Sequence, residues 1–103
     1  MNRRMYFVYI MTNISNTTLY IGFTNNLARR IKEHKDEVND GFSKIYKTKK
    51  IVYYEVLEDP ENGIRREKQI KGKSRAYKEK LINSTNPCWK DLSEQIIKYQ
   101  AGA

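Results

Sequence analysis

Two tyrosines, an arginine, a histidine and a glutamate have spacings that suit the hydrolysis of a phosphodiester bond. Tyr9 and Tyr20 lie in two short apolar segments separated by a polar turn, so both phenols are expected on paired strands of one sheet. Arg30 and His34 are four residues apart and would project from one face of a helix. Glu67 would come from a later, basic helix. Such a set can bind one hard metal ion and neutralise the charge of a scissile phosphate.

The segments that carry these residues predict a small α/β domain. Strands are expected at 5–11, 18–23 and 51–57, where β-branched and aromatic residues are frequent. Helices are expected at 27–38, capped by one of the two preceding asparagines, and at 64–77. The fold class is therefore expected to be α/β, with a small three-stranded, predominantly antiparallel sheet flanked by helices.

The second half of the chain contains two signals that can interrupt a helix. A turn is expected at 58–63, and Gly72 is expected to kink or break the long basic helix, since glycine costs up to roughly 1 kcal/mol relative to alanine. A separate helix could follow at 78–82. We expect one nuclease-like domain over 1–92, and a C-terminal helix with a frayed tail over 93–103 that belongs to the same domain.

The composition favours a polyanionic partner. The chain has 103 residues, with 20 Lys and Arg against 12 Asp and Glu, and a formal net charge of +8. A basic surface of this kind suits nucleic acid, although lysines that merely keep a small protein soluble would also explain the charge. Within the basic runs, the candidate contacts to a nucleic-acid backbone are Lys44, Tyr46, Lys71 and Arg75.

The single cysteine and the short apolar runs limit the cellular locations to be expected for the protein. Cys88 alone cannot form an intramolecular disulfide or a cysteine-rich zinc site, which favours a reducing cytoplasm. The apolar run at 5–11 is too short for a signal-peptide core or a membrane span. We therefore expect a soluble, cytoplasmic protein with no membrane partner.

The segments that contain Tyr9, Tyr20 and the other candidate residues resemble the GIY-YIG nuclease superfamily, and in particular its small stand-alone bacterial members. The tripeptide at 20–22, Tyr-Ile-Gly, is identical to the second name-giving tripeptide. The tripeptide at 7–9 reads Phe-Val-Tyr where the first has Gly-Ile-Tyr, so the tyrosine is retained. The likeness runs from residue 5 to about residue 92 through further matching segments at 22–30, 41–46, 52–55, 66–71 and 86–92.

The resemblance implies a role for the acid and the two phenols. Glu67 would be the only direct protein ligand of one Mg²⁺ or Mn²⁺ ion, and the competing interpretation is a surface ion pair with Lys71. Tyr9 would be the general base, and Tyr20 would bind the phosphate or the attacking water. A phenol is a poor base at neutral pH, so a cation such as Arg30 would have to favour its phenolate.

The resemblance also implies roles for the remaining candidates. Arg30 would hold two phosphate oxygens with its planar guanidinium, whereas its neighbour Arg29 is expected to face solvent. His34 would orient the nucleophile or relay a proton, and the alternative is a buried structural histidine. Asn86 would help to position the site, or would serve only as a turn residue before Pro87.

The chain is therefore expected to be a metal-dependent nuclease, with DNA favoured over RNA as its substrate. One departure from the pattern is Phe23, which stands where repair-type relatives have a lysine and removes a cation from the site. Together with the degenerate first tripeptide, it motivates an alternative function, a non-catalytic nucleic-acid-binding module of the same fold. A partner-binding module in a repair complex is a further alternative.

Overall fold

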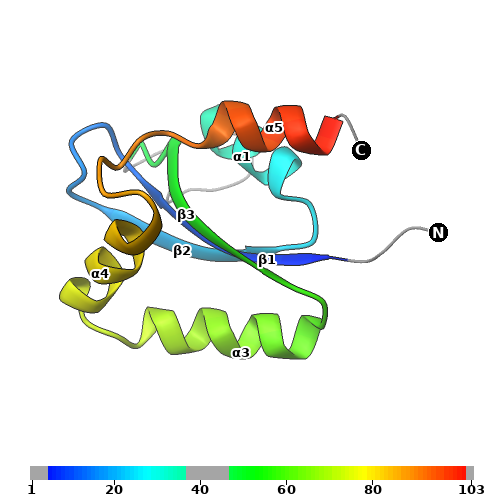
Figure 1. The fold of residues 1–103 in the computed structure, drawn as a ribbon, viewed down its shortest axis with the longest axis horizontal. Coiled ribbons are helices and arrows are strands. Elements are labelled where there is room, and N and C mark those ends of the chain that lie inside the picture. Colours follow the sequence, from blue (N-terminus) through cyan, green and yellow to red (C-terminus); the bar gives the residue numbers. More distant parts are fainter. Residues whose placement is uncertain (1–4, 37–46, 102–103) are drawn as a thin grey trace.

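The computed structural model describes residues 5–36 and 47–101. Within these residues the expected α/β class is confirmed: a three-stranded antiparallel sheet in the order β2-β1-β3 lies between helices (Figure 1). In chain order, the elements are β1 (Tyr6–Thr12), β2 (Leu19–Thr24), α1 (Leu27–Asp36), β3 (Lys50–Leu57), α3 (Pro60–Lys71), α4 (Arg75–Thr85) and α5 (Ser93–Ala101).

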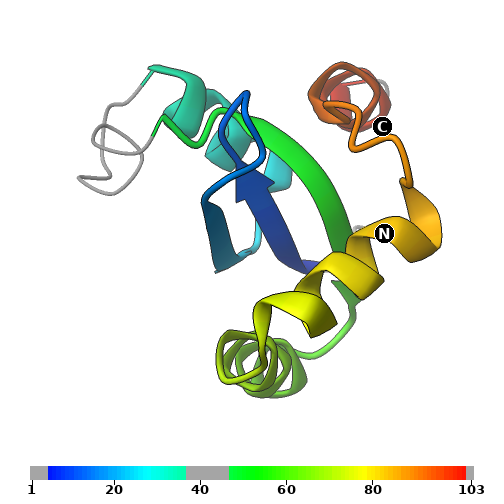
Figure 2. The same cartoon turned by 90° about the vertical axis from the view of Figure 1, so that its left-hand side faces the viewer.

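Two hydrophobic cores lie on the two faces of the sheet, because successive side chains of a strand point to opposite faces. Figure 2 shows α1 and α5 on one face and α3 and α4 on the other. The core beneath α1 and α5 contains Phe7, Tyr9, Met11, Leu27, Ile31, Ile51 and Ile96. The core beneath α3 and α4 contains Val8, Ile10, Ile21, Val52, Tyr53, Ile70 and Ile82.

The ladder between β1 and β3 contains a β-bulge. Its register shifts by one residue between Ile10 and Met11, so the ladder skips Val52 on β3. Val52 and its neighbour Tyr53 therefore both lie in the core that faces α3 and α4. The same shift places Glu55 on that face of the sheet.

The turn expected at 58–63 is wrong, because α3 already begins at Pro60. Asp59 is the N-cap, and one of its carboxylate oxygens accepts a hydrogen bond from the Asn62 amide at 3.1 Å. Proline is favoured at the first position of a helix, where its missing N–H is not needed. An Asp-Pro pair therefore suits a helix start as well as a turn, and here it starts a helix.

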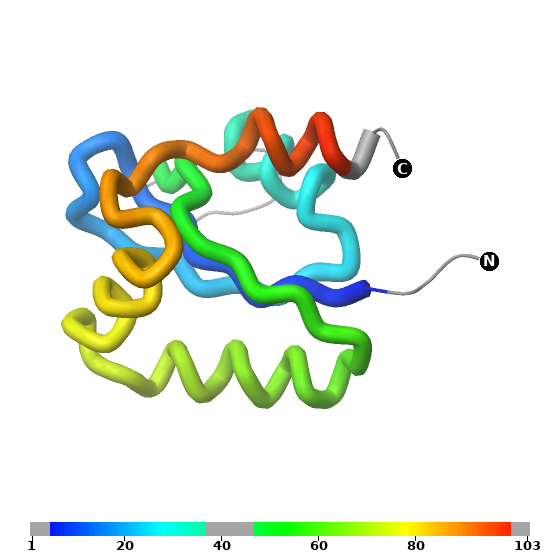
Figure 3. Tube along the Cα trace, in the orientation of Figure 1, coloured from blue at the N-terminus to red at the C-terminus, as the bar shows by residue number. Residues whose placement is uncertain are grey.

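The predicted break at Gly72 is confirmed, and the single helix expected at 64–77 is therefore divided in two. The first part, α3, ends at Lys71, and Gly72 is its C-cap. The second part, α4, starts after the N-cap Ser74, earlier than the separate helix expected at 78–82. The chain then returns past the β3 strand to α5, as the tube in Figure 3 shows.

The other predicted elements agree closely with the structure. Each strand lies within one residue of its expected bounds, and Asn26 caps α1 by accepting a hydrogen bond from the Arg29 amide at 3.1 Å. The expected end of this helix near 38 lies outside the described residues, as do the last two residues of the tail expected to fray at 101–103, whereas Ala101 is the last residue of α5. No helix in the described part of the chain is long and apolar enough to cross a membrane.

Candidate active site

The two tyrosines lie on neighbouring strands, on the face of the sheet that α1 covers. Tyr9 is directly opposite Gly22 in the ladder, and the ring centroids of Tyr9 and Tyr20 are 6.2 Å apart. A Cβ atom added to Gly22 would lie 2.3 Å from the hydroxyl oxygen of Tyr9. The Tyr9 ring lies over Gly22, in space that any side chain at this position would occupy. The glycine of the tripeptide therefore has a steric role.

The guanidinium of Arg30 joins the two phenols. Its Nε donates to the Tyr9 hydroxyl oxygen at 3.1 Å, and its Nη2 donates to the Tyr20 hydroxyl oxygen at 3.4 Å. Its Nη1 forms an ion pair with Glu33 at 3.0 Å. Burial opposes the charged form, but the interactions with Tyr9, Glu33 and Tyr20 outweigh it, so the pKa of Arg30 is raised and the side chain stays cationic.

His34 is fully buried beneath this cluster. Its ring meets both phenol rings at steep angles, with centroids 4.9 Å from Tyr20 and 6.1 Å from Tyr9. Its Nδ1 lies 3.2 Å from the carbonyl oxygen of Thr48, and because a carbonyl oxygen only accepts, Nδ1 must carry the hydrogen. His34 therefore supports the tyrosines and also fixes the segment that leads into β3.

The four residues differ in their access to solvent. Tyr9 is 1% exposed and His34 is 0% exposed. Tyr20 and Arg30 are half-buried. A phosphate that arrives from solvent would therefore meet Tyr20 and Arg30 first, with Tyr9 lying beneath them.

Glu67 comes from the opposite face of the sheet. It lies on α3, which packs against β1 and β2, and its carboxylate forms an ion pair with Lys71 at 3.3 Å. Among the described residues, no hydrogen bond or ion pair joins Glu67 to Tyr9, Tyr20 or Arg30. The competing interpretation from the sequence, an ion pair with Lys71, is thus present in the structure.

A hollow at the free edge of β2 lies between the two faces. Tyr20 and Lys71 both line this hollow, which has a volume of about 290 Å³, together with Leu19, Ile21 and Lys78. The order of the strands makes β2 an edge strand, so side chains from both faces can meet there. Tyr20 and Lys71, the ion-pair partner of Glu67, therefore border the same hollow.

The donor chemistry of Glu67 suits a hard divalent ion. Within the described residues, no group of three or more His, Cys, Asp or Glu side chains is placed to hold a metal. The Glu67 side chain is 18% exposed, and a single carboxylate with water as the remaining ligands fits Mg²⁺, which keeps most of its waters in proteins.

An ion pair anchors α3 and therefore the neighbourhood of Glu67. Arg66 donates from Nε and Nη2 to the two carboxylate oxygens of Glu55 on β3, at 2.9 and 2.8 Å. Tyr53 also donates to Glu55, and Arg66 reaches the Tyr77 hydroxyl on α4 at 3.3 Å. Burial raises the pKa of Glu55, but the hydrogen bonds from Arg66 and Tyr53 outweigh it, so its pKa is lowered overall.

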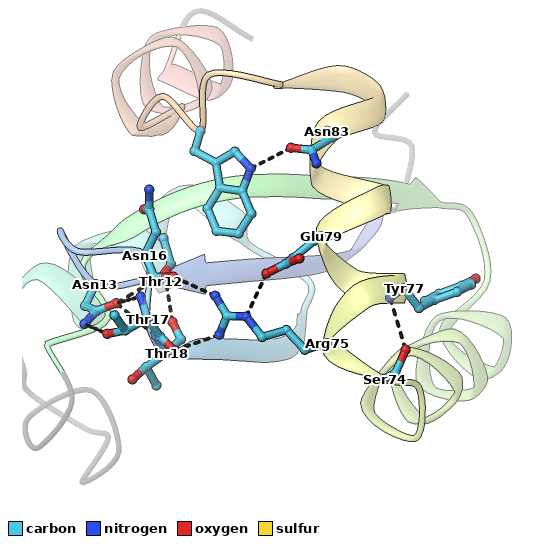
Figure 4. Close-up of polar contacts among 11 residues, drawn as sticks. Thr12, Asn13, Asn16, Thr17, Thr18, Ser74, Arg75, Tyr77, Glu79 and Asn83 are labelled. Atoms are coloured by element: carbon cyan, nitrogen blue, oxygen red, sulfur yellow. Dashed lines mark hydrogen bonds and ion pairs between the residues drawn. The ribbon is translucent and has the colours of Figure 1, made fainter.

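The candidate nucleic-acid contact Arg75 makes three structural contacts within the chain (Figure 4). Its guanidinium donates to the carbonyl oxygens of Asn16 and Thr17 in the β1–β2 turn, at 2.6 and 2.7 Å, and to Glu79 at 2.9 Å. These bonds tie the start of α4 to the N-terminal hairpin.

Asn86 also makes structural contacts. Asn86 is buried, and its side-chain amide donates to the carbonyl oxygens of Val52 and Lys90 at 3.1 and 2.8 Å. It organises the loop after α4, as the turn interpretation expected. Lys44 and Tyr46 lie outside the described residues.

Two residues have roles that the sequence did not reveal. Glu33 is half-buried and pairs with Arg30, a contact that the i, i+3 spacing could have indicated. Phe23 stacks on Tyr6 with ring centroids 5.9 Å apart, and a Cβ on Gly63 would lie 2.4 Å from the Phe23 ring. Phe23 therefore fills the interface between β2 and α3.

The sheet order, with two tyrosines and an arginine gathered on one face, agrees with the small α/β domain that the motifs predict. A family model described as "GIY-YIG catalytic domain" matches residues 5–83. The chain therefore belongs to the GIY-YIG family, and the family expected from its motifs is confirmed.

The chain is also similar to individual proteins over most of its length. The chain is 36% identical over 80 residues to a UPF0213 protein of Clostridium perfringens, covering 78% of this chain and 85% of the relative. It is 37% identical over 82 residues to a UPF0213 protein of Syntrophus aciditrophicus, covering 79% and 92%. The solution NMR structure of a UPF0213 protein from Bacillus halodurans has a TM-score of 0.55 at 23% identity, covering 87% of this chain and 95% of that one, and shows the same fold.

Proposed function

We propose that the protein is a metal-dependent nuclease that hydrolyses phosphodiester bonds of nucleic acid, with DNA as its preferred substrate. The observation that carries this proposal is the bonding of one guanidinium, that of Arg30, to the hydroxyl groups of both Tyr9 and Tyr20. Membership of the GIY-YIG family supports the reaction class. The positive net charge supports a polyanionic substrate.

The geometry suggests how the cluster would meet a phosphate. The longer of the two bonds, from Arg30 to Tyr20 at 3.4 Å, is the one that a phosphate oxygen would most easily replace. Arg30 would then neutralise charge on the non-bridging oxygens, and the released Tyr20 hydroxyl would bind the phosphate or the attacking water. The buried His34 would hold both rings in place.

Tyr9 would act as a phenolate, having first lost its own proton to solvent, and would then take the proton of the attacking water and become a neutral phenol. Its hydroxyl oxygen accepts from Arg30 at 3.1 Å, and this cation would stabilise the phenolate before the transfer. A divalent ion held by Glu67 would stabilise charge at the departing 3′ oxygen. Glu67 forms an ion pair with Lys71 in the structure, and this ion pair would have to break when the ion binds.

The test is a cleavage assay with Mg²⁺ or Mn²⁺ on a panel of labelled DNA and RNA structures. We expect Glu67→Ala to abolish cleavage while it preserves the fold and most of the affinity for nucleic acid. Glu61→Ala is the matched control, because Glu61 is an exposed acid in the first turn of the same helix. Undiminished cleavage by a folded Glu67→Ala protein would remove the proposed metal ligand.

A non-catalytic nucleic-acid-binding module is the second candidate function. Two observations favour it: Glu67 is paired with Lys71 on the far face of the sheet, and Tyr9 is 1% exposed. Binding of nucleic acid by the unmutated protein, without cleavage of any substrate under either metal, would make this candidate the better one.

A further inference from the structure

An acidic side chain, that of Glu33, lies beside the tyrosine cluster, one turn along α1 from Arg30. Its carboxylate accepts from Nη1 of Arg30 at 3.0 Å, and it approaches Nε of Arg29 at 4.0 Å. The Arg30 and Glu33 side chains are both half-buried, whereas the Arg29 side chain is exposed. Ion pairs with a fully exposed partner contribute little, so the pair with Arg30 is the one that can fix a geometry.

The pair with Glu33 determines which edge of the Arg30 guanidinium faces the phenols. Each of its three nitrogens donates to a different side chain: Nε to Tyr9, Nη2 to Tyr20 and Nη1 to Glu33. The group is planar and rigid, so holding one nitrogen also fixes where the other two point. Glu33 lies three residues after Arg30 on the same helix, so this anchor belongs to the element that carries the arginine.

The three bonds of the guanidinium differ in strength. In the bond to Glu33, at 3.0 Å, both partners are charged, which makes it stronger than a bond to a neutral acceptor. The phenols are neutral at their ordinary pKa, and the bond to Tyr20, at 3.4 Å, is the longest of the three. An arginine side chain loses much rotamer entropy when it is held in one position. The bond to Glu33 therefore contributes most to holding Arg30 in place.

We propose that Glu33 is a positioning residue that keeps Arg30 on Tyr9 while a phosphate binds. This inference rests on the proposed function, in which a phosphate oxygen replaces the bond from Arg30 to Tyr20. Without Glu33, the guanidinium could rotate toward the phosphate and release the Tyr9 oxygen. With Glu33 holding Nη1, Nη2 exchanges Tyr20 for the phosphate while Nε stays on Tyr9 and stabilises its phenolate.

The first experiment needs no cleavage. It measures the hydrogen-exchange rate of the Arg30 Nε–H by heteronuclear NMR, with the signal identified by its absence in Arg30→Lys. We expect Glu33→Ala to raise this rate roughly tenfold or more, because the bond to Tyr9 then opens more often. Glu33→Gln keeps a carbonyl acceptor without the charge, so it should retain most of the protection. Arg29→Gln is the matched control, because it removes the contact of Glu33 with Arg29 and leaves the one with Arg30.

The second experiment measures kcat for cleavage of labelled DNA with Mg²⁺ or Mn²⁺. We expect Glu33→Ala to lower kcat roughly ten- to hundred-fold, because a misplaced guanidinium no longer stabilises the phenolate and the phosphate together. Glu33→Gln should recover most of this loss, and Arg29→Gln should match the wild type. A neutral amide would not replace a carboxylate that acted only through its charge.

The outcomes separate this inference from the proposed function. Equal exchange rates in the wild type and Glu33→Ala would overturn the positioning role, even if the protein cleaves DNA. Equal loss of protection in Glu33→Ala and Glu33→Gln would overturn it as well, because the charge and not the anchor would then matter. Protection in the expected order supports the role of Glu33, even if no substrate is cleaved and the proposed function fails.

Discussion

At the scale of single residues, Arg30 is the side chain that holds the cluster together, and its shape matters as much as its charge. We expect Arg30→Lys to lower kcat/KM for cleavage roughly a hundred-fold, because lysine cannot donate to two phenols and a phosphate from one planar group. The control is Arg29→Lys, since the Arg29 side chain is 61% exposed and only approaches Glu33, at 4.0 Å. Small, equal effects at both positions would mean that Arg30 has no special part in the reaction.

Gly22 gives a second prediction at this scale. We expect Gly22→Ala to destabilise the protein by about 1–3 kcal/mol, because the new methyl group would collide with the buried Tyr9 ring. Gly72→Ala is the matched control: its Cβ would have 3.5 Å to the nearest atom, and the φ of −79° suits alanine. Urea unfolding of the two variants measures the difference. A Gly22→Ala protein as stable as the control would show that the Tyr9 ring can move aside at little cost.

At the scale of elements, the ion pair between β3 and α3 predicts a dependence of stability on pH. The pKa of Glu55 in the folded protein is lowered from its ordinary value of 4.5, so the folded state favours the ionised carboxylate. The stability from this pair is fully present above about pH 5 and is lost as the pH falls through the lowered pKa. We expect Glu55→Gln to be less stable at neutral pH, and its stability to fall less on acidification than that of the wild type.

Thermal or urea unfolding between pH 7 and pH 3 measures this difference. Asp36→Asn is a suitable control, since it removes an exposed acid at the end of α1. Parallel pH profiles for the wild type and Glu55→Gln would show that the pair with Arg66 contributes nothing to the acid sensitivity.

The elements also show what the sequence could predict. The three strands and α1 follow from apolar spacing and from an asparagine cap, which are local signals, and Tyr9, Tyr20, Arg30 and His34 meet as their spacings predict. The pairing of Arg66 with Glu55 could not be predicted, because it depends on a bulge and joins residues 11 apart on two different elements.

At the scale of the whole molecule, Arg75 joins parts of the chain that are 58 and 59 residues apart. We expect Arg75→Gln to lower the free energy of unfolding by about 1–2 kcal/mol, because two carbonyls of the hairpin turn lose a charged donor. It should leave the salt slope of DNA binding almost unchanged.

Hydrogen exchange at the amides of the β1–β2 turn, together with urea unfolding, tests this prediction. The control is Arg65→Gln, whose guanidinium is exposed and bonds only within α3, to Asn62 at 2.8 Å. A steep loss of DNA affinity with unchanged stability would return Arg75 to the role of a backbone contact that the sequence first suggested.

The bulge at Val52 determines where the chain can change in length. Residues on either side of it already pair with consecutive residues of β1, so deleting Val52 would leave an uninterrupted ladder with every other side chain on its present face. The free energy of unfolding would fall by about the contribution of one buried valine side chain, roughly 1.5–3 kcal/mol. Deleting Tyr54 instead would exchange the faces of part of β3 and separate Glu55 from Arg66. Relatives that differ by one residue in this strand should therefore carry the gap at Val52, and alignments that place it elsewhere would pair residues from opposite sides of the sheet.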